Sequence, residues 1–379
     1  MAPKSIKKAE DLVTPHEEVC AGFLAQARSK NAEAKPYLTQ AVKFWNAIEK
    51  LERPEDVATL YTNPEYREEL LAAAGYSKKS LGNLRKLFSE DEMTDLLRQF
   101  FETGFDAASF KSEIYARYLL TKGDSLGGTM RNVIGAQGKE RFKNALIAAL
   151  ERRKLSCEIK EYKGRVRGIE WITGRKIQVT SGAGVMEERE EKRMIVFDAT
   201  PRQLGIVAPD IAVEEVQVEA IMTDAESLDA MPAQAESTDA ESPKDESKKN
   251  NVDIIVLDST HELEKKRRKT EESKASFERR RNNLFKNPKN YLASGELKSG
   301  IDPAGADEHF KTAGSAIGRL RERFAEHGIN LPLFIVAAAV ARAMAGEIYA
   351  DLQSGVLSYA ANFTNSQQLE ELADWVVSL

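Results

Sequence analysis

The first 110 residues carry apolar side chains at the three- and four-residue spacing of amphipathic helices. Proline residues separate the apolar segments, as they do between consecutive helices. The segments predicted to be helical are Val19 to Ala27, Tyr37 to Ile48, Glu69 to Ala74 and Glu92 to Phe101. We therefore expect residues 1–110 to form an N-terminal helical region.

Beyond Cys157 the apolar positions alternate with polar ones, which is the period of a half-buried strand. The alternating segments are E-I-K-E-Y-K, V-R-G-I-E-W-I-T, K-I-Q-V-T and R-M-I-V-F-D. Two further strands are predicted at N-V-D-I-I-V-L-D and Y-L-A-S-G-E-L-K, followed by a helix from Asp302 and Pro303 and by C-terminal helices. L-F-I-V-A-A-A-V fits either a buried strand or a helix start. The pattern predicts an α/β fold, with a mixed-sheet catalytic core over residues 111–379 and an added helical region.

The glycine-rich segment Gly123 to Asn132 precedes an amphipathic pattern that runs to Arg153. Asp124, Ser125 or Thr129 would cap a helix starting there, and the neighbouring glycines would let backbone amides approach an anion. A tight turn into a core helix is the alternative. No G-K-[S/T] follows, so the segment is not a nucleotide P-loop.

Charge is distributed unevenly along the chain. The net charge is −5, but residues 214–250 hold eleven acidic residues and three lysines, which gives this segment −8 and the remainder +3. Without any aromatic residue and with T-D-A-E-S occurring twice, residues 214–250 are predicted to be a disordered insert. It is interpreted as a tolerated surface insertion, or as an acidic DNA mimic that shields a basic cleft.

Basic clusters follow the N-V-D-I strand in the sequence, whereas the acidic segment precedes it. They lie at Lys265 to Lys269 and at Arg279, Arg280 and Arg281. Such clusters neutralise phosphates, so they predict DNA contacts. Interleaved glutamates leave a second interpretation open, in which they form a solvated, charge-laced helix.

Candidate chemistry concentrates on the two central strands. Glu296 and Lys298 stand two residues apart, so they point to one face of their strand. Asp253 interrupts the apolar run of the preceding strand, where a charged residue is normally excluded. A carboxylate facing a carboxylate and a lysine on the neighbouring strand is typical of a metal-dependent phosphodiesterase, whereas a solvated strand face is the alternative.

Several segments in the same order resemble the AvaI/BsoBI group of type II restriction endonucleases, within the PD-(D/E)xK nuclease superfamily. The similar segments are E-E-V-C-A-G-F near Glu17, G-D-S-L-G-G-T-M-R-N, N-V-D-I, G-E-L-K-S-G-I-D-P-A-G-A-D-E-H, L-Q-S-G and the tryptophan-containing C-terminus. Residues from about 160 to 290 depart from the family. The resemblance implies a magnesium-dependent nuclease that cuts both strands of DNA.

In this scheme Asp253, Glu296 and the carbonyl oxygen of Leu297 are the expected ligands of Mg²⁺. Lys298 is expected to stabilise charge at the phosphate or the attacking water. His309, on the helix after the catalytic strand, is expected to be the general base, although a lone helical histidine is more often structural or exposed.

The resemblance also implies base contacts and a recognition sequence. Lys79, Lys249 and Asp302 are the expected DNA contacts, with Asp302 accepting from cytosine N4. Solvent exposure or phosphate contact is the alternative for Lys79, and helix capping for Asp302. The implied site is C-Y-C-G-R-G, cut after the first base to leave four-base 5′ overhangs. A palindrome requires a homodimer, with a methyltransferase as the functional partner.

Two other functions remain compatible with these residues: a less sequence-specific repair or recombination nuclease, and a noncatalytic DNA-binding protein. No membrane role is expected, because the longest apolar run, Leu331 to Ala345, is too short to span a bilayer and contains Arg342. The N-terminus lacks the apolar core of a signal peptide, so a cytoplasmic location is expected.

Overall fold

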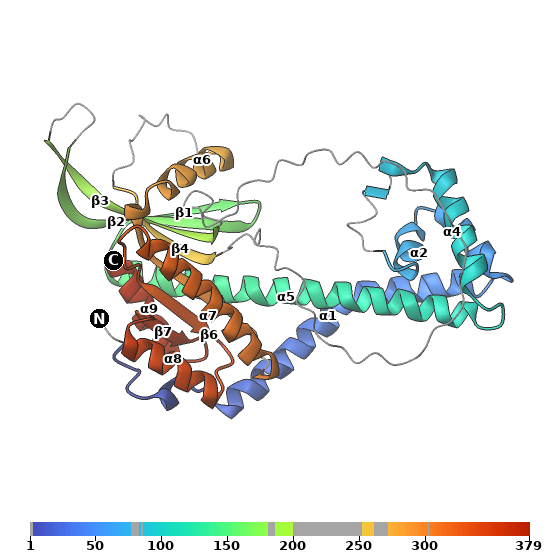
Figure 1. Cartoon of the computed structure of the whole chain (residues 1–379), viewed down its shortest axis with the longest axis horizontal. Coiled ribbons are helices and arrows are strands. Elements are labelled where there is room, and N and C mark those ends of the chain that lie inside the picture. Colours follow the sequence, from blue (N-terminus) through green and yellow to red (C-terminus); the bar gives the residue numbers. More distant parts are fainter. Residues whose placement is uncertain are drawn as a thin grey trace.

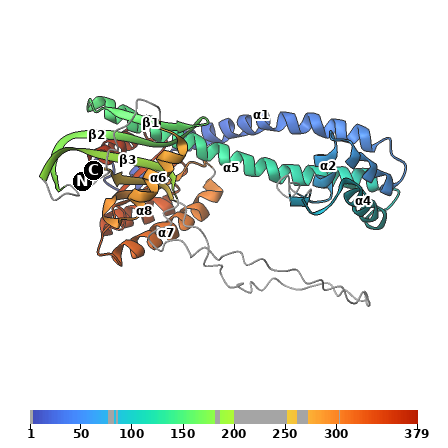
Figure 2. The same cartoon turned by 90° about the horizontal axis from the view of Figure 1, so that it is seen from above.

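A computed structural model describes residues 3–76, 83–84, 86–180, 186–199, 252–260, 272–301 and 303–379. The molecule is elongated, with a sheet-containing body at one end and a helical region at the other (Figure 1). Two long helices, α1 (His16–Ile48) and α5 (Phe110–Arg152), connect these ends, and the chain runs along them in opposite directions (Figures 1 and 2).

The helical region confirms the predicted N-terminal helices. It contains the C-terminal part of α1, a 3₁₀ segment (Pro54–Thr62), α2 (Arg67–Ala73), α4 (Glu90–Gly104) and the first turns of α5. The first two predicted helices are one continuous α1, with Pro36 inside it. Phe44, Phe101 and Tyr118 are fully buried at the centre of this region, and the ring centroids of Phe44 and Tyr118 lie 4.9 Å apart.

The glycine-rich segment Gly123 to Asn132 lies inside α5, so both the predicted helix start and the predicted turn are wrong. The side chains of Ser125 and Thr129 do not cap a helix. Each donates to the carbonyl four residues earlier, over 3.0 Å, as hydroxyls do within a helix. The helix continues through this segment because its first half packs in the helical core and its second half packs on the sheet.

The body is built on a seven-stranded sheet in the order β1 to β7. Its strands are β1 (Cys157–Tyr162), β2 (Arg165–Thr180), β3 (Met186–Ala199), β4 (Val252–Asp258), β5 (Tyr291–Lys298), β6 (Leu333–Ala337) and β7 (Tyr359–Asn362). Strands β1 to β5 are antiparallel neighbours, whereas β5, β6 and β7 are parallel. The mixed α/β prediction is confirmed, two predicted strands merge into β2, and L-F-I-V-A is a strand.

Helices cover both faces of the sheet. On one face lie α6 (Lys274–Phe285), α7 (Pro303–Ala325) and α8 (Arg342–Ser354), and on the other lie α9 (Ser366–Ser378) and the end of α5. The neighbours Ile254 and Ile255 belong to opposite cores, because side chains alternate along a strand. Ile6 and Leu12 also pack into the sheet core. The predicted boundary at residue 110 falls at the start of α5, which continues into the body.

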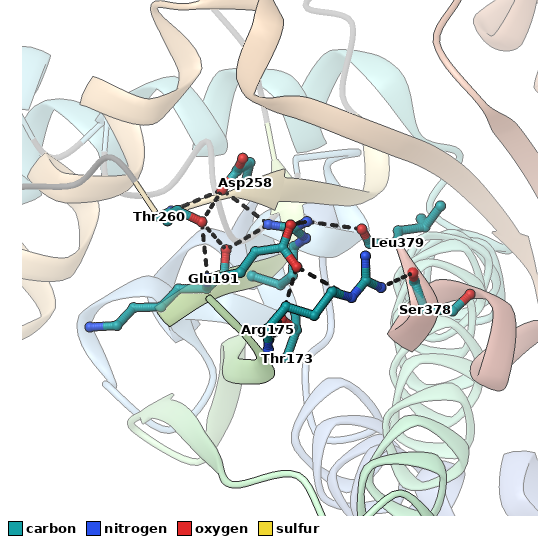
Figure 3. A network of polar contacts seen from close by, with 9 residues as sticks. Thr173, Arg175, Glu191, Asp258, Thr260, Ser378 and Leu379 are labelled. Carbon is teal, nitrogen blue, oxygen red and sulfur yellow. Dashed lines mark hydrogen bonds and ion pairs between the residues drawn. The ribbon is translucent and has the colours of Figure 1, made fainter. Parts of the chain in front are cut away.

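A polar network fastens the C-terminal end of the chain to the sheet (Figure 3). Arg193 of β3 is only 4% exposed and donates to the carbonyl of Leu379 over 3.0 Å. Its guanidinium also pairs with Glu191 and with Asp258 at the end of β4. Arg175 donates to the carbonyl of Ser378 over 3.1 Å. These contacts fix the end of α9 against β2 and β3, and Arg193 also joins β3 to the end of β4.

None of the helices in the described part of the chain has the length and apolarity needed to cross a membrane.

Candidate active site

Asp253 and Glu296 lie opposite each other on the central strands β4 and β5. Ile254 of β4 pairs with Gly295 of β5. Because the two strands are antiparallel, the next position along the pairing brings Asp253 opposite Glu296. The backbone N–H of Leu297 donates to Oδ2 of Asp253 over 2.9 Å, and Nζ of Lys298 donates to Oε2 of Glu296 over 2.9 Å. The structure thus brings together Asp253, Glu296 and Lys298, together with the backbone of Leu297.

Gly295 explains how β5 is held at this position. A Cβ atom on Gly295 would lie 2.2 Å from the ring of Phe334, its partner on β6, so only glycine fits without displacing the buried ring. Close packing of β5 on β6 therefore fixes the strand that carries Glu296.

Glu296 has an electrostatic environment suited to a cation. Its side chain is 6% exposed, and Oε1 is buried without a hydrogen-bond partner in the described structure. Burial, reinforced by the nearby carboxylate of Asp253, raises its pKa to about 7, while the ammonium of Lys298 acts in the opposite direction. A buried carboxylate oxygen with no partner is costly unless something else satisfies it.

The residues present fit a divalent cation with hard oxygen ligands. Asp253, Glu296 and the Leu297 carbonyl would supply the protein oxygens, and Oε1 of Glu296 has no hydrogen-bond partner among the described residues. No group of three or more His, Cys, Asp or Glu side chains is placed for a metal among the residues that the structure describes. Water and phosphate oxygens would complete the coordination, which is the manner in which Mg²⁺ is commonly bound.

Two further charged residues, Lys139 and Asp198, lie at this site and were missed by sequence reasoning. Lys139 of α5 hydrogen-bonds to Asp198 of β3, and its Nζ lies 3.6 Å from Oδ1 of Asp253. Asp198 ends the apolar segment R-M-I-V-F-D, which is the same signal that identified Asp253. Nothing in the sequence distinguishes Lys139 from the other basic residues of α5.

The placement of Lys139 depends on a close contact just before it. A Cβ atom on Gly138 would lie 2.3 Å from the side chain of Ser299, the residue after Lys298. The hydroxyl of Ser299 in turn donates to the carbonyl of Ile134 over 3.1 Å. Glycine thus lets α5 approach the end of β5, and the following residue reaches the carboxylates.

The structure describes few of the other predicted site residues. His309 lies in α7, the helix that begins five residues after Lys298, but its side chain is outside the described part of the structure. Lys79, Lys249 and Asp302 lie outside the described residues, as do the acidic segment 214–250 and the basic cluster Lys265 to Lys269.

The three arginines of α6 have different environments. Arg279 is exposed to solvent. Arg280 pairs with Glu170 of β2 and Glu272, where its role is to attach α6 to the sheet. Arg281 lies 5.7 Å from the ring centroid of Phe285, and burial lowers its pKa. Arg279 is therefore the arginine of this cluster best placed to meet a phosphate.

Comparison with known proteins covers nearly the whole chain. The family described as restriction endonuclease BsobI matches residues 3–200 and 246–379. The type II restriction enzyme AvaI of Nostoc sp. (strain PCC 7120 / SAG 25.82 / UTEX 2576) is 32% identical over 381 residues, covering 99% of this chain and 98% of that enzyme. The type II restriction enzyme BsoBI of Geobacillus stearothermophilus is 30% identical over 379 residues, covering 99% of this chain and 97% of that enzyme. The matched ranges include Asp198, Asp253, Glu296 and Lys298.

Proposed function

Since this chain belongs to the BsobI restriction endonuclease family and is a type II restriction endonuclease, we propose that it cleaves both DNA strands at C-Y-C-G-R-G with Mg²⁺ as cofactor. Cleavage after the first base would leave four-base 5′ overhangs. The observation that supports this chemistry is the opposition of Asp253 and Glu296, with Lys298 bonded to Glu296 and with Oε1 of Glu296 buried and without a hydrogen-bond partner among the described residues.

Each of the central residues has a distinct task in the proposed reaction. Asp253, oriented by the N–H of Leu297, and Glu296 would hold the cation through their oxygens. A bound divalent ion polarises the phosphate and lowers the pKa of coordinated water. Lys298 places its ammonium beside the developing negative charge. His309 is proposed as the general base that takes the proton of the attacking water.

Protonation of Glu296 links cleavage to pH. With a pKa of about 7 in the metal-free protein, Glu296 must lose its proton before it holds a cation. Metal binding therefore releases a proton, and the apparent metal affinity falls as the pH drops below 7.

DNA recognition is assigned to residues outside this centre. Lys79, Lys249 and Asp302 are proposed to contact base edges, and Arg279, Arg280 and Arg281 to lie along the phosphate backbone, with Arg279 the most exposed of the three. A palindromic site read on both strands requires two copies of the chain related by a two-fold axis, so we infer a homodimer. A methyltransferase that modifies the same sequence is the expected partner, and the cytoplasm the expected location.

The test is digestion of phage DNA with Mg²⁺, followed by sequencing of the cut ends. Wild-type protein should give discrete fragments that all end at C-Y-C-G-R-G. Lys298→Ala should give none, while Lys289→Ala, an exposed lysine just before the same strand, should cut as wild type does. Discrete fragments with another end sequence would refute the proposed site, and a smear would identify a less specific nuclease. Cutting by Lys298→Ala would refute the assigned chemistry.

A further inference from the structure

Lys139 brings a second ammonium group to the nuclease site from outside the strands that carry the Asp and Glu-x-Lys residues. Its Nζ is hydrogen-bonded to Asp198 and lies 3.6 Å from Oδ1 of Asp253, which is longer than a hydrogen bond. The side chain is 27% exposed, so water screens it only partly. Lys139 thus stands beside one oxygen of Asp253 without being bonded to it.

The two oxygens of Asp253 have different surroundings. Oδ2 accepts the N–H of Leu297 over 2.9 Å, which already fixes the orientation of this short side chain. Lys139 faces Oδ1. Orientation is therefore supplied by the backbone, and the main effect of Lys139 on Asp253 is its charge.

We propose that Lys139, held by Asp198, stands at Asp253 as a resident cation and lowers the affinity of the site for a divalent metal. An ammonium near a metal-binding oxygen repels an incoming cation, and the repulsion is doubled for a divalent ion. Asp198 counters this repulsion because its carboxylate accepts a hydrogen bond from the Lys139 ammonium and neutralises its charge. This inference rests on the proposed binding of a divalent cation at Asp253 and Glu296.

Charge on the site explains why such a pair is useful to a nuclease. Asp198, Asp253 and Glu296 present three carboxylates, and Lys139 and Lys298 present two ammonium groups. In the metal-free protein the lysines reduce the repulsion that these carboxylates exert on a DNA phosphate. The same positive charge lowers metal affinity, so the Lys139–Asp198 pair balances DNA approach against cation binding.

The backbone conformation at Asp198 limits which substitution can test its role. Asp198 has a φ of +53°, in the left-handed region, although it lies within β3. Aspartate and asparagine adopt this conformation more readily than other non-glycine residues. Asparagine is therefore the substitution that removes the charge of Asp198 while keeping its backbone.

The test measures binding of Mn²⁺ to the full-length protein without DNA, by titration calorimetry at pH 8. Lys139→Met should lower the dissociation constant about tenfold, which corresponds to about 1.4 kcal/mol, because Asp198 is left as an additional negative charge. Asp198→Asn should raise it by a similar factor, because Lys139 is left without its counter-charge. The double variant should bind Mn²⁺ more tightly than Asp198→Asn and less tightly than Lys139→Met, because both charges are then absent.

DNA binding in EDTA provides a second readout with the opposite sign. Lys139→Met should weaken binding of a cognate duplex and Asp198→Asn should strengthen it. Lys143→Met is the matched control, because Lys143 lies one turn further along α5 and pairs with Glu140 of its own helix. This control should change neither Mn²⁺ nor DNA affinity.

Three results separate the inference from the function on which it rests. Unchanged or weaker Mn²⁺ binding by Lys139→Met, with wild type binding normally and thermal unfolding showing a folded variant, would overturn the role of Lys139 alone. If Asp198→Asn bound Mn²⁺ as wild type does, the anchoring role would be overturned. If Asp253→Asn bound Mn²⁺ as tightly as wild type, the metal site and the inference would both be wrong.

Discussion

Substitution of Glu296 by glutamine should stabilise the metal-free protein at alkaline pH. Glutamine has the shape of the protonated carboxyl but carries no charge at any pH. In the folded protein the pKa of Glu296 is raised from its ordinary value of 4.5 to about 7, mainly because the side chain is buried. The folded state therefore holds this proton more tightly than the unfolded chain does.

The size and sign of the effect follow from these two pKa values. Below pH 4.5 both states are protonated, and the burial of Glu296 costs no ionisation energy. Stability falls as the pH rises from 4.5 to about 7, because the unfolded chain ionises first. Above pH 7 the cost is complete, and at about 1.4 kcal/mol per pH unit it amounts to about 3 kcal/mol. Glu296→Gln removes this cost.

The assay is thermal unfolding in EDTA of wild type and Glu296→Gln across pH 5 to 9. The melting temperatures should be similar at pH 5 and should diverge above pH 7, with the variant higher by about 6 to 12 °C for a body of this size. Glu370→Gln, a glutamate on the exposed side of α9, is the control and should follow wild type. Parallel curves for wild type and Glu296→Gln would refute the elevated pKa.

Three further predictions concern packing and charge around the site. Arg280→Ala should lower stability by about 2 kcal/mol through loss of its partly buried ion pairs. Arg279→Ala should leave the melting temperature unchanged and reduce the salt dependence of DNA binding by about one phosphate contact. Equal melting temperatures for the two variants would contradict the different roles assigned to these arginines. Gly138→Ala should destabilise by about 1 to 3 kcal/mol and reduce cleavage, while Gly135→Ala, with open space at its Cβ, should be neutral or stabilising by up to about 1 kcal/mol. Arg193→Met should cost about 3 kcal/mol, measured by denaturant unfolding, and unchanged stability would show that the C-terminal network is not needed.

The sequence predicted the central part of the site because its signals are local. Alternation along two strands placed Asp253, Glu296 and Lys298 on one face, and the register of β4 with β5 agrees with this. The helices and strands with clear periodicity were also predicted correctly. These features depend on residues close together in the chain, where spacing alone determines which side chains share a face.

The features that the sequence did not predict depend on contacts between distant segments. The glycine-rich segment Gly123 to Asn132 has the composition of a turn, yet packing at both ends of α5 keeps it helical. Lys139 reaches Asp253 only because Gly138 permits close contact with Ser299. The ion pairs of Arg280 with Glu170 likewise join residues 110 positions apart. Tertiary packing determined each of these outcomes, and no local pattern encodes it.

The continuity of α5 restricts how this chain can change in length. Phe110 packs in the helical core and Lys139 stands beside Asp253, on one unbroken helix that rises about 44 Å between them. Inserting or deleting a single residue between these positions would rotate one end relative to the other by about 100° and shift it by about 1.5 Å. The buried side chains at the two ends of α5 could then no longer face the helical core and the sheet at the same time. Changes in length are instead expected in the connections, and the family match is indeed interrupted at residues 201–245, outside every helix and strand that the structure describes.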